Sequence, residues 1–345
     1  MSKILVTTPN KNVGGVYHFV KNIVPCFDCT IHIFKRGRLF VGQKRNPFDL
    51  ILLPIRFIST LIKSKSNKII INTSLSKGNL LRDGLLVFLS KLLRRKTLLI
   101  IHGFQEKALK NKTLLRLGYF QADAIIVLAD EFKEKLIEAG YKKEIYIQFN
   151  PVQNDILNIK SNRDINRISD LLFISRIEKE KGIYIAIDTF RILKERYANM
   201  KLHIAGDGTE LENIKEYINS HNINDVIFYG YVKDDEKLKL LKETDAFIFP
   251  TAYKEGLPIS VLEAMAAGQL VITRPVGGLV DLYKDCDYGI MTLSLNATEY
   301  VEAYENLISQ DGKMASIRNN NILFAKNNFA PQIIADKIIK ILDSL

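Results

Sequence analysis

Short runs rich in β-branched residues alternate with longer amphipathic segments along nearly all of this 345-residue chain, and this alternation constrains the fold more than any other feature. The runs lack strict polar alternation, which is typical of strands covered on both faces in a parallel sheet. The pattern therefore predicts doubly wound α/β architecture. The expected strands are 4–8, 31–34, 68–72, 97–102, 124–128, 144–149, 170–174, 201–205, 226–229, 246–249 and 270–273.

The length of the chain favours two domains of about 150–180 residues each over a single core. The boundary is predicted near Asn150-Pro151-Val152, because the polar stretch 158–170 that follows is typical of a linker. We expect an N-terminal domain over 1–152, a C-terminal domain over 153–330 and a helix over 331–345 that packs back on the N-terminal domain. Ligands of such sheets bind at the carboxyl ends of strands, so we expect the two domains to face each other across a cleft that holds the site.

The most informative stretch is 255–268, EGLPISVLEAMAAG. Its second part favours a helix, with Pro258 in the first turn and Gly268 at the C-terminal cap. A helix start offers backbone N–H groups and the positive end of the helix dipole, which predicts an anion site suited to a diphosphate. Glu255 and Glu263 flank that site. Carboxylates beside a phosphate repel it unless they form hydrogen bonds with neutral groups, such as the hydroxyls of the sugar and the ribose. The alternative is that both glutamates are exposed on a surface helix.

A diphosphate also needs cations, and the segment 175–182, SRIEKEKG, supplies them directly after a predicted strand. Arg176 can form paired hydrogen bonds with phosphate oxygens, and Lys181 adds a compact charge beside the flexible Gly182. An arginine and a lysine five residues apart are weak evidence alone, because charged loops are common.

Together these residues resemble glycosyltransferase family 4, whose retaining enzymes have the GT-B fold and a Glu-x7-Glu signature like Glu255 to Glu263. Arg176 and Lys181-Gly182 match the family's Arg and Lys-Gly element. Other elements follow in the family's order: Ala205-Gly206-Asp207-Gly208, Gly230-Tyr231-Val232, Asp245 with Pro250, and Gly277-Gly278. The resemblance is specific over about 170–330. Over 1–150 it is loose and rests on Gly14-Gly15, His102-Gly103 and Asn150-Pro151.

The resemblance implies a role for each matching residue. Glu255 would contact the hydroxyls of the donor sugar and Glu263 the ribose, while Arg176 and Lys181 would bind the diphosphate and stabilise it as leaving group. His102 would face the reacting sugar from the N-terminal domain. The remaining donor-binding residues would be Gly256, Leu257, Pro258 and Ile259 at the helix start, Gly206 and Gly208, Tyr231 and Val232 near the base, and Gly14 and Gly15 near the phosphate or acceptor.

Other readings of single motifs are weaker. Asp285-Cys286-Asp287 spells the Asp-x-Asp pattern that holds a metal in some glycosyltransferases, but it lies in a polar turn, and we expect neither a metal nor a cofactor beyond the donor. Cys26 and Cys29 have redox-motif spacing without a second ligand pair. Gly206-x-Gly208 is too short for a dinucleotide fingerprint.

We therefore predict a metal-independent hexosyltransferase that moves sugar from a nucleoside diphosphate, with UDP expected, to a glycan or lipid-linked acceptor in capsule or lipopolysaccharide synthesis. The alternatives are a sugar-nucleotide epimerase and a catalytically silent binding subunit. An epimerase would need an acid and a base, for which only His102 is a candidate. A silent subunit would not need to retain the intact set of Glu255, Glu263, Arg176 and Lys181.

The net charge of +11 is concentrated in the first third of the chain, where several basic runs occur. This asymmetry predicts attraction to an anionic surface, for which a membrane is favoured; the alternative is a solvated lysine-rich surface. Nucleic acid is disfavoured because the runs carry no interleaved aromatic platform. The stretch 50–62 is apolar but is interrupted by Pro54 and Arg56, and is too short to span a bilayer. No signal peptide is recognised, so we expect a cytoplasmic protein, peripheral at the inner face of the membrane.

Overall fold

The computed structural model describes residues 3–10, 14–37, 47–160, 170–284 and 287–345, with the side chains of 47–50 excepted. The chain divides into two compact units. The first unit comprises Met1–Pro151, Glu255–Leu257 and Pro331–Leu345, and the second comprises Val152–Lys254 and Pro258–Ala330.

The first unit is built on a six-stranded sheet whose paired strands are all parallel. Its strand order is β2 (Thr30–Arg36), β1 (Lys3–Pro9), β3 (Lys68–Leu75), β4 (Lys96–Phe104), β5 (Ala124–Val127) and β6 (Ile145–Ile147). Its helices are α1 (Gly15–Ile23), α2 (Pro47–Ser64), α3 (Lys77–Leu92), α4 (Lys112–Leu117), α5 (Asp130–Glu138) and α14 (Pro331–Ser344).

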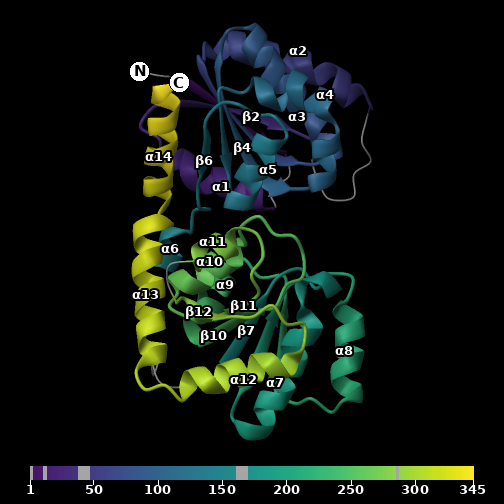
Figure 1. Cartoon of the computed structure of the whole chain (residues 1–345), viewed down its shortest axis with the longest axis vertical. Helices are drawn as coiled ribbons and strands as arrows, with labels where there is room; N and C mark the ends of the chain where they lie inside the picture. Colours follow the sequence, from purple (N-terminus) through teal and green to yellow (C-terminus); the bar gives the residue numbers. More distant parts are fainter. Residues whose placement is uncertain (1–2, 11–13, 38–46, 161–169, 285–286) are drawn as a thin grey trace. The chain divides into compact units, whose positions relative to one another are not determined.

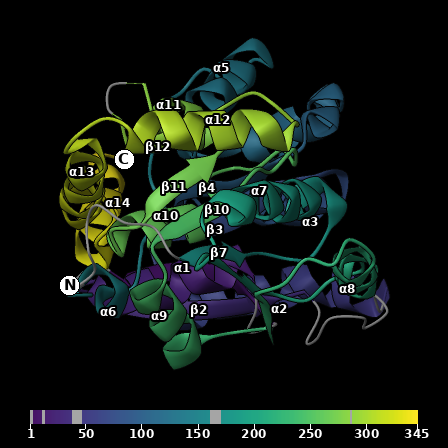
Figure 2. The same ribbon diagram turned by 90° about the horizontal axis from the view of Figure 1, so that it is seen from below.

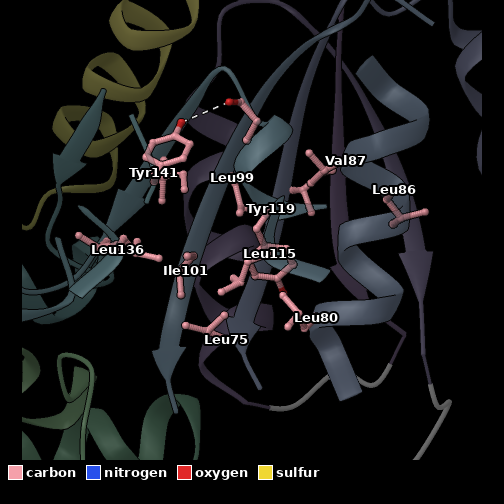
Figure 3. Packing of buried hydrophobic residues seen from close by; sticks show 14 of the residues in the cluster. Leu75, Leu80, Leu86, Val87, Leu99, Ile101, Leu115, Tyr119, Leu136 and Tyr141 are labelled. Carbon is pink, nitrogen blue, oxygen red and sulfur yellow. Dashed lines mark hydrogen bonds between the residues drawn. The ribbon is translucent and has the colours of Figure 1, made fainter. Parts of the chain in front are cut away.

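Both faces of the first sheet are covered, as the apolar strands predict. In β3 the side chains alternate, so Ile69 and Ile71 join one buried cluster and Ile70 joins another. The first cluster includes side chains of α2, α3, α4 and α5; the second includes those of α1 and α14. Figure 1 shows α2, α3 and α4 together on one side of this sheet. Figure 3 shows the first cluster at close range, with Tyr119 between Leu80 and Leu99.

The second unit has a six-stranded sheet that is also parallel throughout. Its order is β12 (Gly289–Met291), β11 (Leu270–Thr273), β10 (Ala246–Phe249), β7 (Asp170–Ile174), β8 (Lys201–Ala205) and β9 (Val226–Gly230). Its helices are α6 (Asn154–Leu157), α7 (Ile183–Arg196), α8 (Leu211–Ser220), α9 (Asp234–Glu243), α10 (Ile259–Ala266), α11 (Gly278–Leu282), α12 (Ala297–Ile308) and α13 (Lys313–Asn328). Helix α12 lies alongside α7, and α10 contacts β10 and β11 (Figure 2).

These two sheets confirm the prediction of two doubly wound α/β domains. The helix predicted at the end of the chain is α14, which packs in the first unit through Ile334, Ala335, Ile338 and Leu342. One local expectation needs correction, because His102 lies inside β4 rather than at its last residue. The apolar stretch around Pro54 belongs to one helix, α2, that contains the proline.

Candidate active site

The second sheet reverses its strand order between β7 and β10, because β8 and β9 extend to one side and β11 and β12 to the other. Ligands of open parallel sheets bind beyond the carboxyl ends of the strands at such a reversal. The loop after β7 carries Arg176 and Lys181, and the loop after β10 begins at Pro250 and leads into residues 255–268, which we call the donor motif. The topology therefore places the two predicted cations at the position where this fold binds ligands.

Backbone hydrogen bonds hold these two loops together. The carbonyl oxygen of Glu180 accepts hydrogen bonds from the N–H groups of Ala252 at 2.8 Å and Tyr253 at 3.0 Å. Gly182 has φ of +81°, and a Cβ there would lie 2.2 Å from the carbonyl oxygen of Pro250. A side chain at position 182 would therefore force the loops apart.

The aromatic ring of Tyr253 brings the two predicted cations together. Lys181 Nζ lies 4.1 Å from the centroid of this ring, and the guanidinium carbon of Arg176 lies 5.9 Å from it. The face of a tyrosine ring attracts cations at these distances. Lys181 is buried and Arg176 is exposed. Two positive charges that share one ring form a site whose charge suits a dianionic group such as a diphosphate.

The neighbouring loop after β8 also packs tightly against the loop after β7. A Cβ on Gly206 would lie 1.8 Å from the carbonyl oxygen of Ser175, and one on Gly208 would lie 2.2 Å from that of Ile177. Both glycines were predicted from the sequence to bind the donor. The close packing of the two loops explains why positions 206 and 208 are glycine without reference to a ligand.

The loop after β9 contains the residues predicted to receive the base. Tyr231 is 62% exposed, whereas Val232 is buried. The carbonyl oxygen of Gly230, which ends β9, accepts a hydrogen bond from the N–H of Gly206 at 2.6 Å. Predicted site residues of the second unit therefore lie in four loops, each at the end of a strand: those after β7, β8, β9 and β10.

Helix α10 of the donor motif begins one residue later than the sequence predicts. Pro258 is its N-cap, and Gly268 follows the helix with φ of +70°. The first hydrogen bond of the helix runs from the N–H of Val261 to the carbonyl oxygen of Pro258 at 3.2 Å. A proline has no side-chain acceptor, so the N-cap does not bind the N–H groups of the half-buried Ile259 and Ser260.

Glu263 is buried on α10, which excludes the reading of this residue as an exposed surface glutamate. Its Oε1 lies 2.5 Å from Nζ of Lys237, which α9 supplies. A carboxylate can accept hydrogen bonds at two oxygens, so a paired Glu263 retains the capacity to accept from hydroxyls. Lys237 neutralises this charge without occupying the whole carboxylate.

Residues 255–257 belong to the first unit by their contacts, although the chain on both sides belongs to the second. Asn150 Nδ2 donates a hydrogen bond to the carbonyl oxygen of Leu257 at 2.8 Å. A Cβ on Gly256 would lie 2.8 Å from the carbonyl oxygen of His102. The half-buried Glu255 therefore lies in a segment that contacts β4, and the boundary between the units runs through the donor motif.

In the first unit, His102 is oriented by a side chain of the adjacent strand β3. His102 Nε2 lies 2.9 Å from Oδ1 of Asn72, whose Nδ2 donates to the carbonyl oxygen of Thr7 at 3.0 Å. An amide oxygen only accepts, so Nε2 carries the proton and Nδ1 carries the lone pair. The ring of Phe19 packs edge-on to the imidazole with centroids 4.6 Å apart. The tautomer and the plane of the ring are both fixed by these contacts.

The surroundings of His102 keep it neutral. Burial is the main cause that lowers the pKa of His102 from 6.5 to about 3, and the positive charge of Arg36 lowers it further. A hydrogen bond with Asn150 raises the pKa but does not offset these two effects. Near neutral pH this side chain is therefore a neutral imidazole and not an imidazolium acid.

A buried charged network lies behind this histidine. Asp83 accepts hydrogen bonds from Arg82 Nε at 2.7 Å and Nη2 at 2.8 Å, and from Thr73 Oγ1 at 2.5 Å. Arg36 Nε lies 3.3 Å from Asp83 Oδ1. Burial alone would raise the pKa of Asp83, but the two arginines outweigh it and lower that pKa. Because Arg36 also donates to the carbonyl oxygen of Asn72, the network supports the residue that orients His102.

Gly14 and Gly15 stand where the first unit's sheet reverses its order, between β1 and β3. Gly14 is the N-cap of α1, with φ of +97°, and Gly15 is the first residue of that helix. A side chain at position 14 would be strained by this backbone conformation even though it would contact nothing within 4 Å.

Sequence reasoning missed three residues of the site: Asn72, Lys237 and Tyr253. Asn72 lies at the end of an apolar strand run, and a polar residue at that position was a usable signal. Lys237 and Tyr253 gave no such signal, because a lysine on a polar helix and a tyrosine in a loop are common surface residues.

Across the described ranges, no group of three or more His, Cys, Asp or Glu side chains is placed to hold a metal ion. Asp285 and Cys286 of the Asp-x-Asp pattern lie outside the described residues. Among the helices that the structure describes, none combines the length and apolar character needed to cross a membrane.

Comparison with known proteins finds a family match within the second unit. Residues 158–324 match the family model described as glycosyl transferases group 1. This segment is therefore similar to group 1 glycosyl transferases. It contains Arg176, Lys181, Tyr253 and both glutamates of the donor motif.

Individual relatives agree with this family match. The chain is 30% identical over 218 residues to the uncharacterized glycosyltransferase MJ1607 of Methanocaldococcus jannaschii, covering 59% of this chain and 55% of that protein. It is 27% identical over 239 residues to the capsular polysaccharide biosynthesis glycosyltransferase CapM of Staphylococcus aureus, covering 65% and 62%. The chain thus spans little more than half the length of these relatives.

The fold of the whole chain resembles that of HepE of Anabaena, whose crystal structure was solved in complex with UDP-glucose. The TM-score is 0.74, the identity is 20%, and both chains are covered completely. This likeness concerns the fold, and it agrees with the two Rossmann-like domains predicted for a GT-B protein.

Proposed function

We propose that this protein is a retaining glycosyltransferase of the family 4 type. It transfers a hexose-type sugar from a nucleoside diphosphate to a hydroxyl of a glycan or lipid-linked acceptor in bacterial surface-polysaccharide synthesis. The observation that carries the proposal is the convergence of Arg176 and Lys181 on the ring of Tyr253, at the strand-order reversal within the segment similar to group 1 glycosyl transferases. CapM, a capsule glycosyltransferase, supports the choice of acceptor class.

UDP is the proposed carrier, since HepE, which shares the fold, was crystallised with UDP-glucose. Arg176 and Lys181 would bind the diphosphate together with the uncapped N–H groups at the start of α10. Glu263, partly neutralised by Lys237, would accept the ribose hydroxyls, and Glu255 would accept hydroxyls of the sugar. The backbone at Tyr231 and Val232 would receive the base.

The chemical contribution of these residues is electrostatic. When the bond between the anomeric carbon and the diphosphate breaks, negative charge develops on the diphosphate, and preorganised cations stabilise it most at that point. Arg176 and Lys181 fill this role without a metal. We favour attack of the acceptor hydroxyl on the same face that the diphosphate leaves, with an oxygen of the departing phosphate accepting the hydroxyl proton, because we assign no carboxylate of the site as the nucleophile of a double displacement.

His102 would face the reacting sugar in this scheme. Its imidazole is held neutral between Asn72 and Asn150 and would contact the sugar without protonating it. A histidine with a pKa of about 3 cannot supply a proton near neutral pH. This argues against the epimerase alternative, which needs an acid as well as a base and for which His102 was the only candidate.

The test is incubation of the purified protein with a panel of sugar nucleotides, with and without glycan acceptors. Acceptor-dependent release of the nucleoside diphosphate is expected. A new sugar nucleotide without release would establish the epimerase instead, and binding without turnover would establish the silent subunit.

A variant pair separates the chemistry from folding. Glu255→Ala should abolish transfer while the thermal unfolding curve stays unchanged. Glu216→Ala, which removes an exposed glutamate from α8, serves as the matched control and should keep full activity. Near-normal transfer by Glu255→Ala would overturn the assignment.

A further inference from the structure

Helix α2 is apolar on two sides. One stripe, at four-residue spacing, is buried against the first sheet and consists of Leu53, Phe57 and Leu61. A second stripe faces outward and consists of Ile51, Leu52, Ile55 and Ile62. Ile51, Ile55 and Ile62 are each more than 60% exposed. A surface helix usually turns one apolar side to the core and a polar side to water, so the outer stripe needs an explanation.

Helix α3 repeats this arrangement. Its inner side, which includes Leu80 and Val87, is buried in the same cluster as the inner side of α2. Its outer side exposes Leu81, Phe88 and Leu92, spaced seven and four residues apart, which places them on one stripe.

The two outer stripes lie on the same side of the first unit. Helices α2 and α3 contact each other, and both pack their inner sides on one face of the sheet. Figure 1 shows them side by side, with their outer surfaces away from the strands. We call the surface formed by Ile51, Leu52, Ile55, Ile62, Leu81, Phe88 and Leu92 the α2–α3 face.

The charge around the α2–α3 face is predominantly positive. Between residues 51 and 96 the only acidic residue is Asp83, which is completely buried. The exposed cations of the same segment are Arg56, Lys63, Lys65, Lys77, Lys91, Arg94 and Lys96. Arg56 and Lys63 follow Ile55 and Ile62 directly in α2, so they border the outer stripe. Lys91 pairs with Asp123 at 3.1 Å, and the side chain of Asp49, earlier in α2, lies outside the described ones. The face therefore combines exposed aliphatic side chains with a border in which exposed cations predominate.

We propose that the α2–α3 face docks on a membrane surface rich in acidic lipids, with both helices lying in the plane of the interface. Aliphatic side chains enter the boundary between head groups and acyl chains, while lysine and arginine pair with anionic head groups. Two copies of this face would bring like charges together, which disfavours a symmetric dimer. The proposal goes beyond the transfer reaction and does not depend on it.

The test is co-sedimentation of the purified protein with vesicles of phosphatidylcholine alone and of phosphatidylcholine mixed with phosphatidylglycerol. Binding is expected to the mixed vesicles and to weaken as salt is raised. Ile55→Glu combined with Phe88→Glu should abolish it. Replacing Lys63 and Arg94 by glutamine should lower it about fivefold per cation.

The matched control is Leu323→Glu on α13, where the native leucine is 61% exposed, about as much as Ile55. This variant should bind vesicles like the native protein. Thermal unfolding and the affinity for UDP are measured for every variant. Values equal to those of the native protein would show that the substitutions leave the fold and the second unit intact. The proposal would be overturned if the double variant Ile55→Glu, Phe88→Glu bound vesicles as well as the native protein, or if the native protein showed no preference for acidic vesicles. It would also be overturned if the native protein bound no vesicles but self-associated, and the double variant did not self-associate.

Discussion

Replacing Asn72 by aspartate should raise the proton affinity of His102. In the native protein, Nε2–H of His102 donates to a neutral amide oxygen 2.9 Å away, and its pKa is about 3. Asn72→Asp replaces that amide with a carboxylate of nearly the same shape. An opposite charge this close raises a histidine pKa by about 1–3 units, so we expect a value of about 4–6 in the variant.

The change in pKa has a defined consequence for stability. One pKa unit corresponds to about 1.4 kcal/mol, and the folded pKa of native His102 lies below the unfolded value of 6.5. The contribution of neutral His102 is therefore fully present above pH 6.5 and is lost as the pH falls toward 3, by about 5 kcal/mol in total. In Asn72→Asp this loss should shrink by about 1.4–4 kcal/mol.

The assay is an NMR titration of protein labelled at the histidine Cε1 positions. The chain has 5 histidines, so His102→Gln assigns the signal by its disappearance. Asn306→Asp, an exposed substitution on α12, is the matched control and should leave the signal unchanged. The reasoning fails if native His102 titrates above about pH 5, or if Asn72→Asp leaves its midpoint where it was.

Three further substitutions test other contacts of the site and its support. Tyr253→Leu removes the ring shared by both cations and should weaken UDP binding about tenfold by calorimetry, whereas Tyr253→Phe should not; equal affinities would contradict the role of the ring. Asp83→Asn leaves buried arginines uncompensated and should lower the free energy of unfolding in urea by about 3–5 kcal/mol, with part regained by adding Arg36→Met; a change under about 1 kcal/mol would contradict this. Lys237→Met should lower affinity for UDP about fivefold and leave affinity for pyrophosphate unchanged, since only UDP carries the ribose that Glu263 is proposed to bind.

The sequence allowed the layers of the fold to be predicted because buried parallel strands are short apolar runs that local composition reveals. The segments 170–174, 201–205, 246–249 and 270–273 match their strands without adjustment. Strand β12 was missed, because three residues carry too little pattern. Helix α2 was not among the expected helices, and it contains Pro54 in its interior, a position that proline usually disfavours.

The residues of the candidate site were predictable where a motif fixed them and not where only contact defines them. Arg176, Lys181 and Glu263 could be selected because their spacing resembles a family signature. The dependence of His102 on Asn72 could not, since the two residues are thirty positions apart and meet only through strand pairing. The burial that shifts the pKa of His102 is likewise a property of the folded unit and has no local trace in the sequence.

The place of α14 has a consequence for how the chain folds as it is made. One face of the first sheet is completed by Ile334, Ala335, Ile338 and Leu342, which follow the whole second unit in the chain. On the ribosome, domains usually fold in the order in which they emerge. Here the second unit can close while the first still exposes a strip of its core to water. The unit that is translated first is therefore completed last, after residues 331–344 have left the exit tunnel.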